Sequence, residues 1–259
     1  MRHFMNRSVL YLIGIICVGS LAFTTLAQAE TRVESSLFFR IYLAFSVDQK
    51  AAQAWLPAPW KAVSFPKGPF KGANLFVILD DKFIVQDGEG KTYKGGTYCS
   101  VALVAFGKSE QTGEFAPFDI RLYWPYDDPG PYKIGVKATV RRGATLHGAD
   151  LGPGTGTEVW RVQDRAGGVL EFWMDYQRAV PKRTKKEFKV RSSVDPNILF
   201  NYQDDYAVDI VKSIPAGIDR VQNYQFRVTM SELGKMFDGS EQLVGILVNP
   251  SRVRQKFLP

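Results

Sequence analysis

Short runs of β-branched and aromatic residues, separated by glycine, proline and aspartate, recur along the chain from residue 37 onward. Such runs predict strands, and the clusters between them predict turns. In Glu187–Arg191, polar and apolar side chains alternate, as in a strand with one buried face. We predict strands at Leu37–Phe45, Ala73–Val85, Thr97–Phe106, Phe118–Trp124, Lys133–Val140, Glu158–Val162, Val169–Gln177, Lys185–Arg191, Asn197–Tyr202, Tyr206–Lys212, Tyr224–Val228 and Leu243–Val248.

Helices are few in this pattern. Asp48–Leu56 contains strong helix formers and ends at Pro57, and Ser231–Phe237 begins with a residue suited to cap a helix. No repeat, linker or change of composition divides residues 30–259. So many strands in an open sheet would leave exposed edges. We therefore predict one mainly β domain over residues 30–259, with a few short helices and a cone-like or barrel-like, strongly curved antiparallel sheet.

The first 29 residues have the pattern of a secretory signal peptide. Arg2 and Arg7 flank the start of an apolar run, Val9–Phe23, and Ala27-Gln28-Ala29 provides a cleavage pattern of small residues. The alternative is an uncleaved membrane anchor, but the run is shorter than the roughly 20 residues that a spanning helix needs. We predict cleavage after Ala29 and a soluble protein that is periplasmic or secreted.

Cleavage would leave Cys99 and His147 as the sole cysteine and histidine. These two residues cannot build a four-ligand zinc site or an intramolecular disulfide, and we predict no metal and no cofactor. His147 also lacks the Gly-x-Ser-x-Gly partner motif of a serine hydrolase. Asp127-Asp128, set among prolines and aromatic residues, is either an acid/base pair or an Asx-type turn.

The segment Arg178–Arg191 carries seven basic residues against one glutamate. Export excludes nucleic acid as its partner. Weak contact with an anionic membrane surface remains open. The alternative is a solvated strand whose lysines protect the edge of a sheet. The sequence sets no oligomeric state.

Several motifs resemble one known family. A predicted strand and helix lead into Leu56-Pro57-Ala58-Pro59-Trp60, a later strand begins with Gly96-Thr97-Tyr98, and Tyr224–Val228 and Leu243–Val248 close the chain. This order resembles the acetoacetate decarboxylase family. The resemblance implies a cone-like antiparallel sheet around an apolar cavity, in agreement with the predicted strands.

The chain departs from that family where its decarboxylases carry Gly-Arg-Glu and then Tyr-Pro-Lys-Lys, with one lysine forming a Schiff base. The best counterpart here is Ile134–Gly143, in which Gly135 matches and Arg141-Arg142 replace the two lysines. Arginine stays protonated and cannot attack a carbonyl. The resemblance therefore implies no Schiff-base decarboxylation of acetoacetate. Lys137, on the same strand, is either a displaced nucleophile or a solvent-facing lysine.

Two functions follow as hypotheses. The first is binding, without catalysis, of a small apolar molecule that bears a carbonyl or carboxylate group. Arginine forks suit a carboxylate and aromatic walls suit an apolar ligand. The second is a lyase of the decarboxylase type, or a hydrolase, that acts on a ketoacid-like substrate through Lys137. Since neighbouring residues on a strand point to opposite faces, at most one of Arg141 and Arg142 faces a cavity. The predicted ligand-binding residues are Arg40, Arg141, Arg142, Trp124 and Tyr98.

Overall fold

A computed structural model describes residues 31–258 of the 259-residue chain, so the predicted signal peptide lies outside the described residues. Residues 31–258 belong to one compact unit. Its fold is mainly β with a few short helices, as the sequence predicts. The strands are β1 (Thr31–Ser46), β2 (Trp60–Ala62), β3 (Leu75–Asp87), β4 (Tyr98–Ser109), β5 (Phe115–Trp124), β6 (Gly135–His147), β7 (Thr155–Asp164), β8 (Val169–Gln177), β9 (Lys182–Ser192), β10 (Leu199–Ser213), β11 (Ile218–Asp219), β12 (Val221–Val228) and β13 (Gln242–Leu258). The helices are α2 (Gln49–Gln53) and the 3₁₀ turns η1 (Gly68–Phe70) and η2 (Ser231–Leu233).

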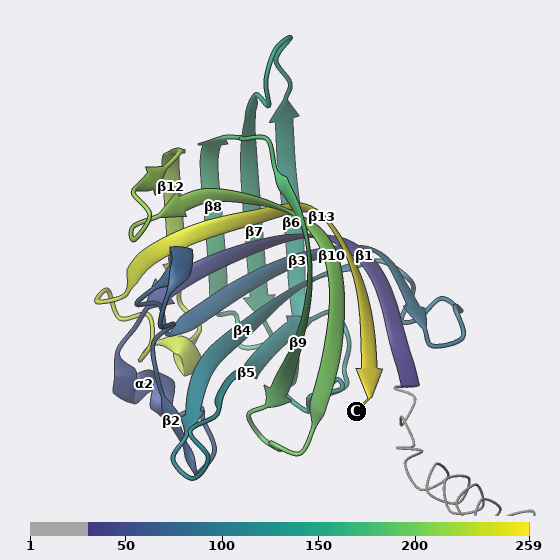
Figure 1. Ribbon diagram of the computed structural model, residues 1–259, viewed down its shortest axis with the longest axis vertical. Coiled ribbons are helices and arrows are strands. Elements are labelled where there is room, and N and C mark those ends of the chain that lie inside the picture. The colour runs from purple at the N-terminus through teal and green to yellow at the C-terminus, as the bar shows by residue number, and fades with distance from the viewer. Residues whose placement is uncertain (1–30, 259) are drawn as a thin grey trace, which may run out of the picture. The chain divides into compact units, whose positions relative to one another are not determined.

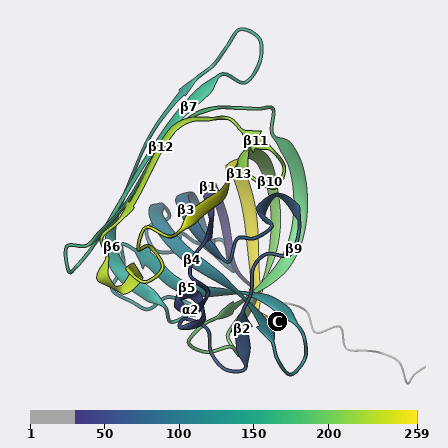
Figure 2. The ribbon, with the colours of Figure 1, turned by 90° about the vertical axis from the view of Figure 1, so that its left-hand side faces the viewer.

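Seven strands close into a ring. Following hydrogen-bonded neighbours, the order is β5, β9, β10, β13, β1, β3 and β4, and β4 pairs with β5 again. From β5 the sheet also extends through β6, β7 and β8 to β12, which forms a second layer beside the ring. Figures 1 and 2 show this layer on one side of β1, β3 and β4. The strongly curved sheet that the sequence predicts is therefore confirmed.

The sheet is mixed, which corrects the prediction of a wholly antiparallel one. β5 pairs in parallel with β6 and with β9, and the other pairings are antiparallel. The β5–β9 contact is short: it joins Phe118 to Arg191 and Asp119 to Ser192. Ten residues separate β5 from β6, whereas β6, β7 and β8 lie between β5 and β9 along the chain.

The main apolar core lies between the ring and the second layer. Along β1, Phe39, Ile41 and Leu43 belong to this core, and it also contains Trp160 of β7 and Phe172 of β8. The alternate β1 residues point to the interior of the ring, since side chains along a strand alternate between its faces. Over residues 38–45, β1 therefore has two covered faces. No helix within residues 31–258 is long and apolar enough to cross a membrane.

Several predicted boundaries change. The two strands predicted at Asn197–Tyr202 and Tyr206–Lys212 are replaced by one continuous strand, β10, which begins at Leu199. β13 runs ten residues beyond its predicted end at Val248. Pro250 lies within β13 and does not end it. Both predicted helices are shorter than expected. Asp48 caps α2 by accepting a hydrogen bond of 2.8 Å from the amide of Ala51, whereas Ser231 lies inside η2 and is not its cap.

Candidate functional site: a charged cavity inside the strand ring

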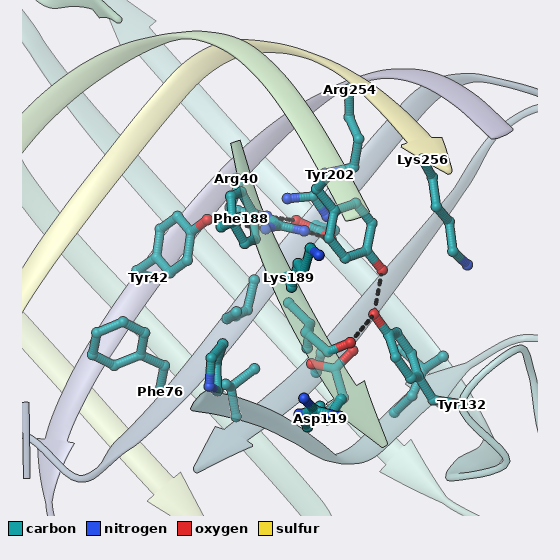
Figure 3. A pocket seen from close by; sticks show the side chains of 18 of the residues that line it. Arg40, Tyr42, Phe76, Asp119, Tyr132, Phe188, Lys189, Tyr202, Arg254 and Lys256 are labelled. Carbon is teal, nitrogen blue, oxygen red and sulfur yellow. Dashed lines mark hydrogen bonds and ion pairs between the residues drawn. The ribbon is translucent and has the colours of Figure 1, made fainter. Parts of the chain in front are cut away.

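A cavity of about 640 Å³ lies inside the ring. Each of the seven ring strands contributes side chains to its wall, and Figure 3 shows part of this lining. One part of the wall is apolar and aromatic: Phe76 packs edge-on against Phe70 and Phe106, with ring centroids 5.4 Å and 4.8 Å apart. Ile78 and Val104 extend this apolar surface.

Charged side chains occupy another part of the wall. Arg40 of β1 donates two hydrogen bonds to Asp80 of β3, of 2.5 and 2.6 Å. Arg252 and Arg254 of β13 both bind Asp204 of β10, over 2.7 to 3.0 Å. All five side chains are buried. Because the arginine fork matches a carboxylate, these pairs fix the guanidinium planes against the wall.

Tyr42 joins the two arginine groups. Its hydroxyl oxygen accepts a hydrogen bond of 3.0 Å from Arg40 and one of 2.5 Å from Arg252. Burial alone raises the pKa of Tyr42, but the guanidiniums of Arg252, Arg40 and Arg254 lower this pKa below its ordinary value. Tyr42 lines the cavity beside Phe76, with ring centroids 5.9 Å apart.

Lys256 is a second kind of charged group. Only 5% of its surface is exposed, and its ammonium lies 3.8 Å from the centroid of the Phe200 ring. No hydrogen bond or ion pair within residues 31–258 holds it. Burial, with Lys82 and Arg254 nearby, lowers the pKa of Lys256 to about 8, although Glu34 opposes this shift. Figure 3 shows its side chain extending from β13 on the side of Tyr202 and Tyr132.

Asp119 of β5 is an acidic residue whose pKa is raised, whereas that of Lys256 is lowered. Burial raises its pKa to about 6, against the attraction of Arg40, Arg254 and Lys256. A carboxyl and an amine with pKa values moved toward neutrality line the same cavity. Such shifts are typical of functional sites, and they support the cavity as the candidate site.

Three of the residues selected from the sequence line this cavity: Arg40, Tyr98 and Trp124. The ring of Tyr98 packs against that of Trp124 with centroids 6.4 Å apart.

The β6 candidates lie elsewhere. Lys137 is exposed and donates a hydrogen bond of 2.9 Å to Asp127. Arg141 is exposed. Arg142 lies between the ring and the second layer, bound to Glu158 and Asp81 at 2.8 Å each. The structure therefore does not bring the β6 candidates together with Arg40.

Asp128 and His147, the other candidates considered from the sequence, lie in a turn and at the end of a strand. Asp128 accepts a hydrogen bond of 2.9 Å from the amide of Gly130, which is the Asx-type turn considered above. His147 ends β6 and is exposed. Within residues 31–258 no group of three or more histidine, cysteine or acidic side chains is arranged to hold a metal ion.

The basic run Arg178–Arg191 forms most of β9. Lys182, Lys185 and Lys189 are exposed, and Arg183 forms an ion pair of 2.6 Å with Asp205 of β10. Part of this run also reaches the cavity, which Lys186, Lys189 and Arg191 help to line.

Sequence reasoning missed the charged end of β13. Arg252, Arg254 and Lys256 alternate with Val253, Gln255 and Phe257, and the charged side chains are the buried ones. Val253 is 49% exposed. The period-two spacing of three cations was visible in the sequence. This spacing predicts a strand with three cations on one face, but it does not show that this face is buried.

Fold and site together define a class: a closed ring of strands, flanked by a second layer, with a partly aromatic and partly charged cavity inside. Solved structures share this fold. The enduracididine biosynthesis enzyme MppR complexed with pyruvate matches with a TM-score of 0.53 and 11% identity, over 91% of this chain and 92% of that chain. An acetoacetate decarboxylase-like enzyme from Sphingomonas wittichii RW1 matches with a TM-score of 0.51 and 9% identity, over 92% and 98%.

An acetoacetate decarboxylase structure matches with a TM-score of 0.50 and 9% identity, over 93% of each chain. No family model and no curated protein sequence matches the chain. The structural matches show that the chain has the acetoacetate decarboxylase-like fold, which the sequence resemblance implied.

Proposed function

We propose that this protein binds a small anionic molecule inside the strand ring. A carboxylate or carbonyl oxygen of the ligand faces the arginine and lysine groups, and its apolar part lies against Phe76 and Phe106. The volume of about 640 Å³ is within the usual range of small-molecule sites, roughly 300–1,000 Å³. As in the sequence interpretation, the primary role is binding.

The charge balance of the cavity carries this proposal. Five cations, Arg40, Lys82, Arg252, Arg254 and Lys256, are buried in or directly behind its wall. Four acids, Glu34, Asp80, Asp119 and Asp204, face them. A buried charge without a partner is costly, so a ligand anion stabilises this surplus.

Similar structures support the ligand class. One structure of MppR, which has the same fold, is a complex with pyruvate, a small acid that carries both a carboxylate and a carbonyl. The aromatic part of the cavity wall here also accommodates an apolar chain or ring larger than the methyl group of pyruvate.

Calorimetry with a panel of alkyl, aromatic and keto acids tests the proposal. Lys256→Gln removes a cation that has no direct acidic partner, so this variant leaves no carboxylate newly unpaired. We expect binding to weaken at least tenfold, since losing a buried charge contact costs about 2 kcal/mol or more. Arg141→Gln is the matched control: its side chain is exposed and outside the cavity. No binding by any acid in the panel, or equal losses in both variants, contradicts the proposal.

Chemistry at an amine is the second candidate function. Lys256 favours it because it is buried, lacks an ion-pair partner among the described residues, and has a pKa lowered to about 8. The neutral amine can attack a ligand carbonyl carbon, form a C–N bond and release the carbonyl oxygen as water, which gives an imine. The Lys137 amine has a different place, since Asp127 holds it at the surface.

Borohydride reduction distinguishes the two candidates. Incubation with acetoacetate or pyruvate and borohydride would convert an imine into a stable secondary amine. Under the binding proposal we expect no adduct by mass spectrometry. An adduct mapped to Lys256, absent in Lys256→Gln, would establish the lyase-type alternative, and an adduct on Lys137 would establish the residue suggested by the sequence.

The place of action is also a proposal: the binding protein works outside the cytoplasm after cleavage behind Ala29. The pattern of Arg2, Arg7 and the apolar run supports it.

A further inference from the structure

The hydroxyl group of Tyr42 is held in an unusual way. A phenolic oxygen has two lone pairs and one proton. Both lone pairs are used here, because Arg40 and Arg252 each donate a hydrogen bond to the oxygen, over 3.0 and 2.5 Å. Within residues 31–258 no acceptor receives the remaining O–H proton. A protonated Tyr42 therefore has its proton available toward the cavity that it lines.

The charge around this oxygen is unbalanced. Arg40 is paired with Asp80, but Arg252 and Arg254 share the single carboxylate of Asp204. Three guanidiniums thus face two carboxylates, and one positive charge is left over beside the Tyr42 oxygen. The groups that act on Tyr42 are Arg40 on its own strand, Arg252 and Arg254 on β13, Phe76 on β3 and Tyr206 on β10. Asp80 and Asp204 bind these arginines.

We propose that Tyr42 is the acid–base residue of the cavity and that an anionic ligand binds together with one proton. When Tyr42 is ionised in the free protein, its phenolate oxygen balances the surplus guanidinium charge. When a ligand carboxylate enters, it supplies the balancing negative charge. Tyr42 then takes a proton from solvent, forming its O–H bond, and donates that proton in a hydrogen bond to a ligand oxygen. The ligand half of this inference rests on the proposed function, whereas the ionisation of Tyr42 in the free protein does not.

The other tyrosines make the inference measurable. The pKa of Tyr42 is lowered, whereas burial raises the pKa of eight other tyrosines: Tyr93, Tyr98, Tyr123, Tyr126, Tyr132, Tyr176, Tyr202 and Tyr206. Tyr206 is a close comparison, because Arg252 lies 4.1 Å from its ring centroid without bonding to its hydroxyl. Tyrosinate absorbance that appears below the ordinary range therefore reports Tyr42.

The first experiment follows the near-ultraviolet absorbance of tyrosinate in the free protein as pH rises. We expect one tyrosine per chain to ionise below the ordinary pKa of about 10. Tyr42→Phe should lose this step, and Tyr206→Phe should keep it. A wild-type protein without any tyrosinate below the ordinary range overturns the inference, and this measurement needs no variant to fold. A step that survives in Tyr42→Phe also overturns it.

The second experiment adds hexanoate, which has a carboxylate and an apolar chain and does not absorb where tyrosinate does. Binding should remove the tyrosinate absorbance, and calorimetry in buffers of different ionisation enthalpy should show proton uptake. Above the Tyr42 pKa, affinity should fall by up to about tenfold per pH unit. Lys256 also titrates in this region, so the same series on Lys256→Gln isolates the contribution of Tyr42, which Tyr42→Phe should abolish.

The outcomes separate the two proposals. Hexanoate binding with an unchanged tyrosinate signal leaves the proposed function intact and overturns proton-coupled binding. Failure of hexanoate and of the other acids to bind removes the proposed function together with the coupling. The titration of the free protein still decides whether Tyr42 ionises.

Discussion

Arg142 connects the strand ring to the second layer, and Arg142→Met tests this connection. The guanidinium donates two hydrogen bonds to Glu158, of 2.8 and 2.9 Å, and one of 2.8 Å to Asp81. It also lies over the ring of Phe39, 3.7 Å from the centroid. Methionine keeps much of the apolar contact but removes the charge. The variant therefore leaves the Glu158 carboxylate, whose exposed fraction is 0%, without its cation.

Removing one partner of a buried ion pair costs about 3–5 kcal/mol in free energy of unfolding. Asp81 adds little to this loss because its side chain is 23% exposed and can be hydrated. Domains of this kind have total stabilities of about 5–15 kcal/mol, so the variant should still fold. In Arg142→Met/Glu158→Gln neither of these two positions carries a buried charge, and Trp160 can still donate to the amide oxygen, so most of the loss should be recovered.

The loss should also depend on pH. Burial already raises the pKa of Glu158 in the wild type, and removing Arg142 raises this pKa further. A raised folded-state pKa means that folding is penalised above it and relieved below it. The destabilisation should therefore be largest at neutral pH and shrink as the pH falls through the raised pKa toward that of the unfolded chain.

Urea denaturation of the two variants and the wild type, at neutral pH and near pH 4, measures these effects. Hexanoate binding by the folded Arg142→Met variant should equal that of the wild type, because Arg142 does not line the cavity. A loss of less than about 1 kcal/mol at neutral pH, or no recovery in the double variant, would refute the reasoning. Loss of binding with stability retained would instead make Arg142 the ligand anchor that the sequence suggested.

Three further predictions concern other parts of the chain. Asp204→Asn should lower the free energy of unfolding by about 3–5 kcal/mol, because its two arginines lose their shared partner. The pKa of Asp204 is lowered well below its ordinary value, so the stability of the wild type should fall as acid protonates this carboxyl. Denaturation measured over a range of pH should show that this part of the acid dependence is missing in the variant. Gly135→Ala should destabilise the protein by about 1–3 kcal/mol in thermal or urea unfolding, because a methyl group would lie 2.7 Å from the Trp124 indole nitrogen and 2.9 Å from backbone; an unchanged midpoint contradicts this. N-terminal sequencing of exported protein should begin at Glu30, and Met1 retained in a membrane fraction would contradict cleavage after Ala29.

The strands that face the apolar core could be predicted from the sequence, because their runs of apolar and aromatic residues are typical of strands. From Leu37 to Phe45 the odd positions of β1 are all apolar, and the even positions combine Phe38, Tyr42 and Ala44 with Arg40, so length and aromatic content predict a strand there. The mainly β class and the curvature follow from the number of such runs. The parallel contacts of β5 could not be predicted, because they depend on which distant strands return beside it.

The charged interior was harder to predict for a physical reason. A strand with cations on one face and apolar residues on the other usually turns its cations to solvent. In β13 the arrangement is reversed, since Arg252 and Arg254 are buried by pairing with Asp204, which lies 50 residues earlier than Arg254. Only the closed ring brings these residues together. Arg40 was selected from the sequence as a cationic anchor, but its partner Asp80 was not, because their contact depends on the register of β1 and β3.

The short contact between β5 and β9 has a consequence for how the interior exchanges its contents. It joins two residue pairs, whereas each of the other ring contacts joins eight or more. Local opening at this contact breaks far fewer backbone hydrogen bonds than separation of any other pair of ring strands, and segments with few such bonds open at the lowest free energy. Asp119 of β5 and Arg191 of β9, which each belong to one of these two pairs, also line the cavity. Amide hydrogens at this contact should therefore exchange before those of β1 and β13, and molecules can reach the interior while the rest of the ring stays folded.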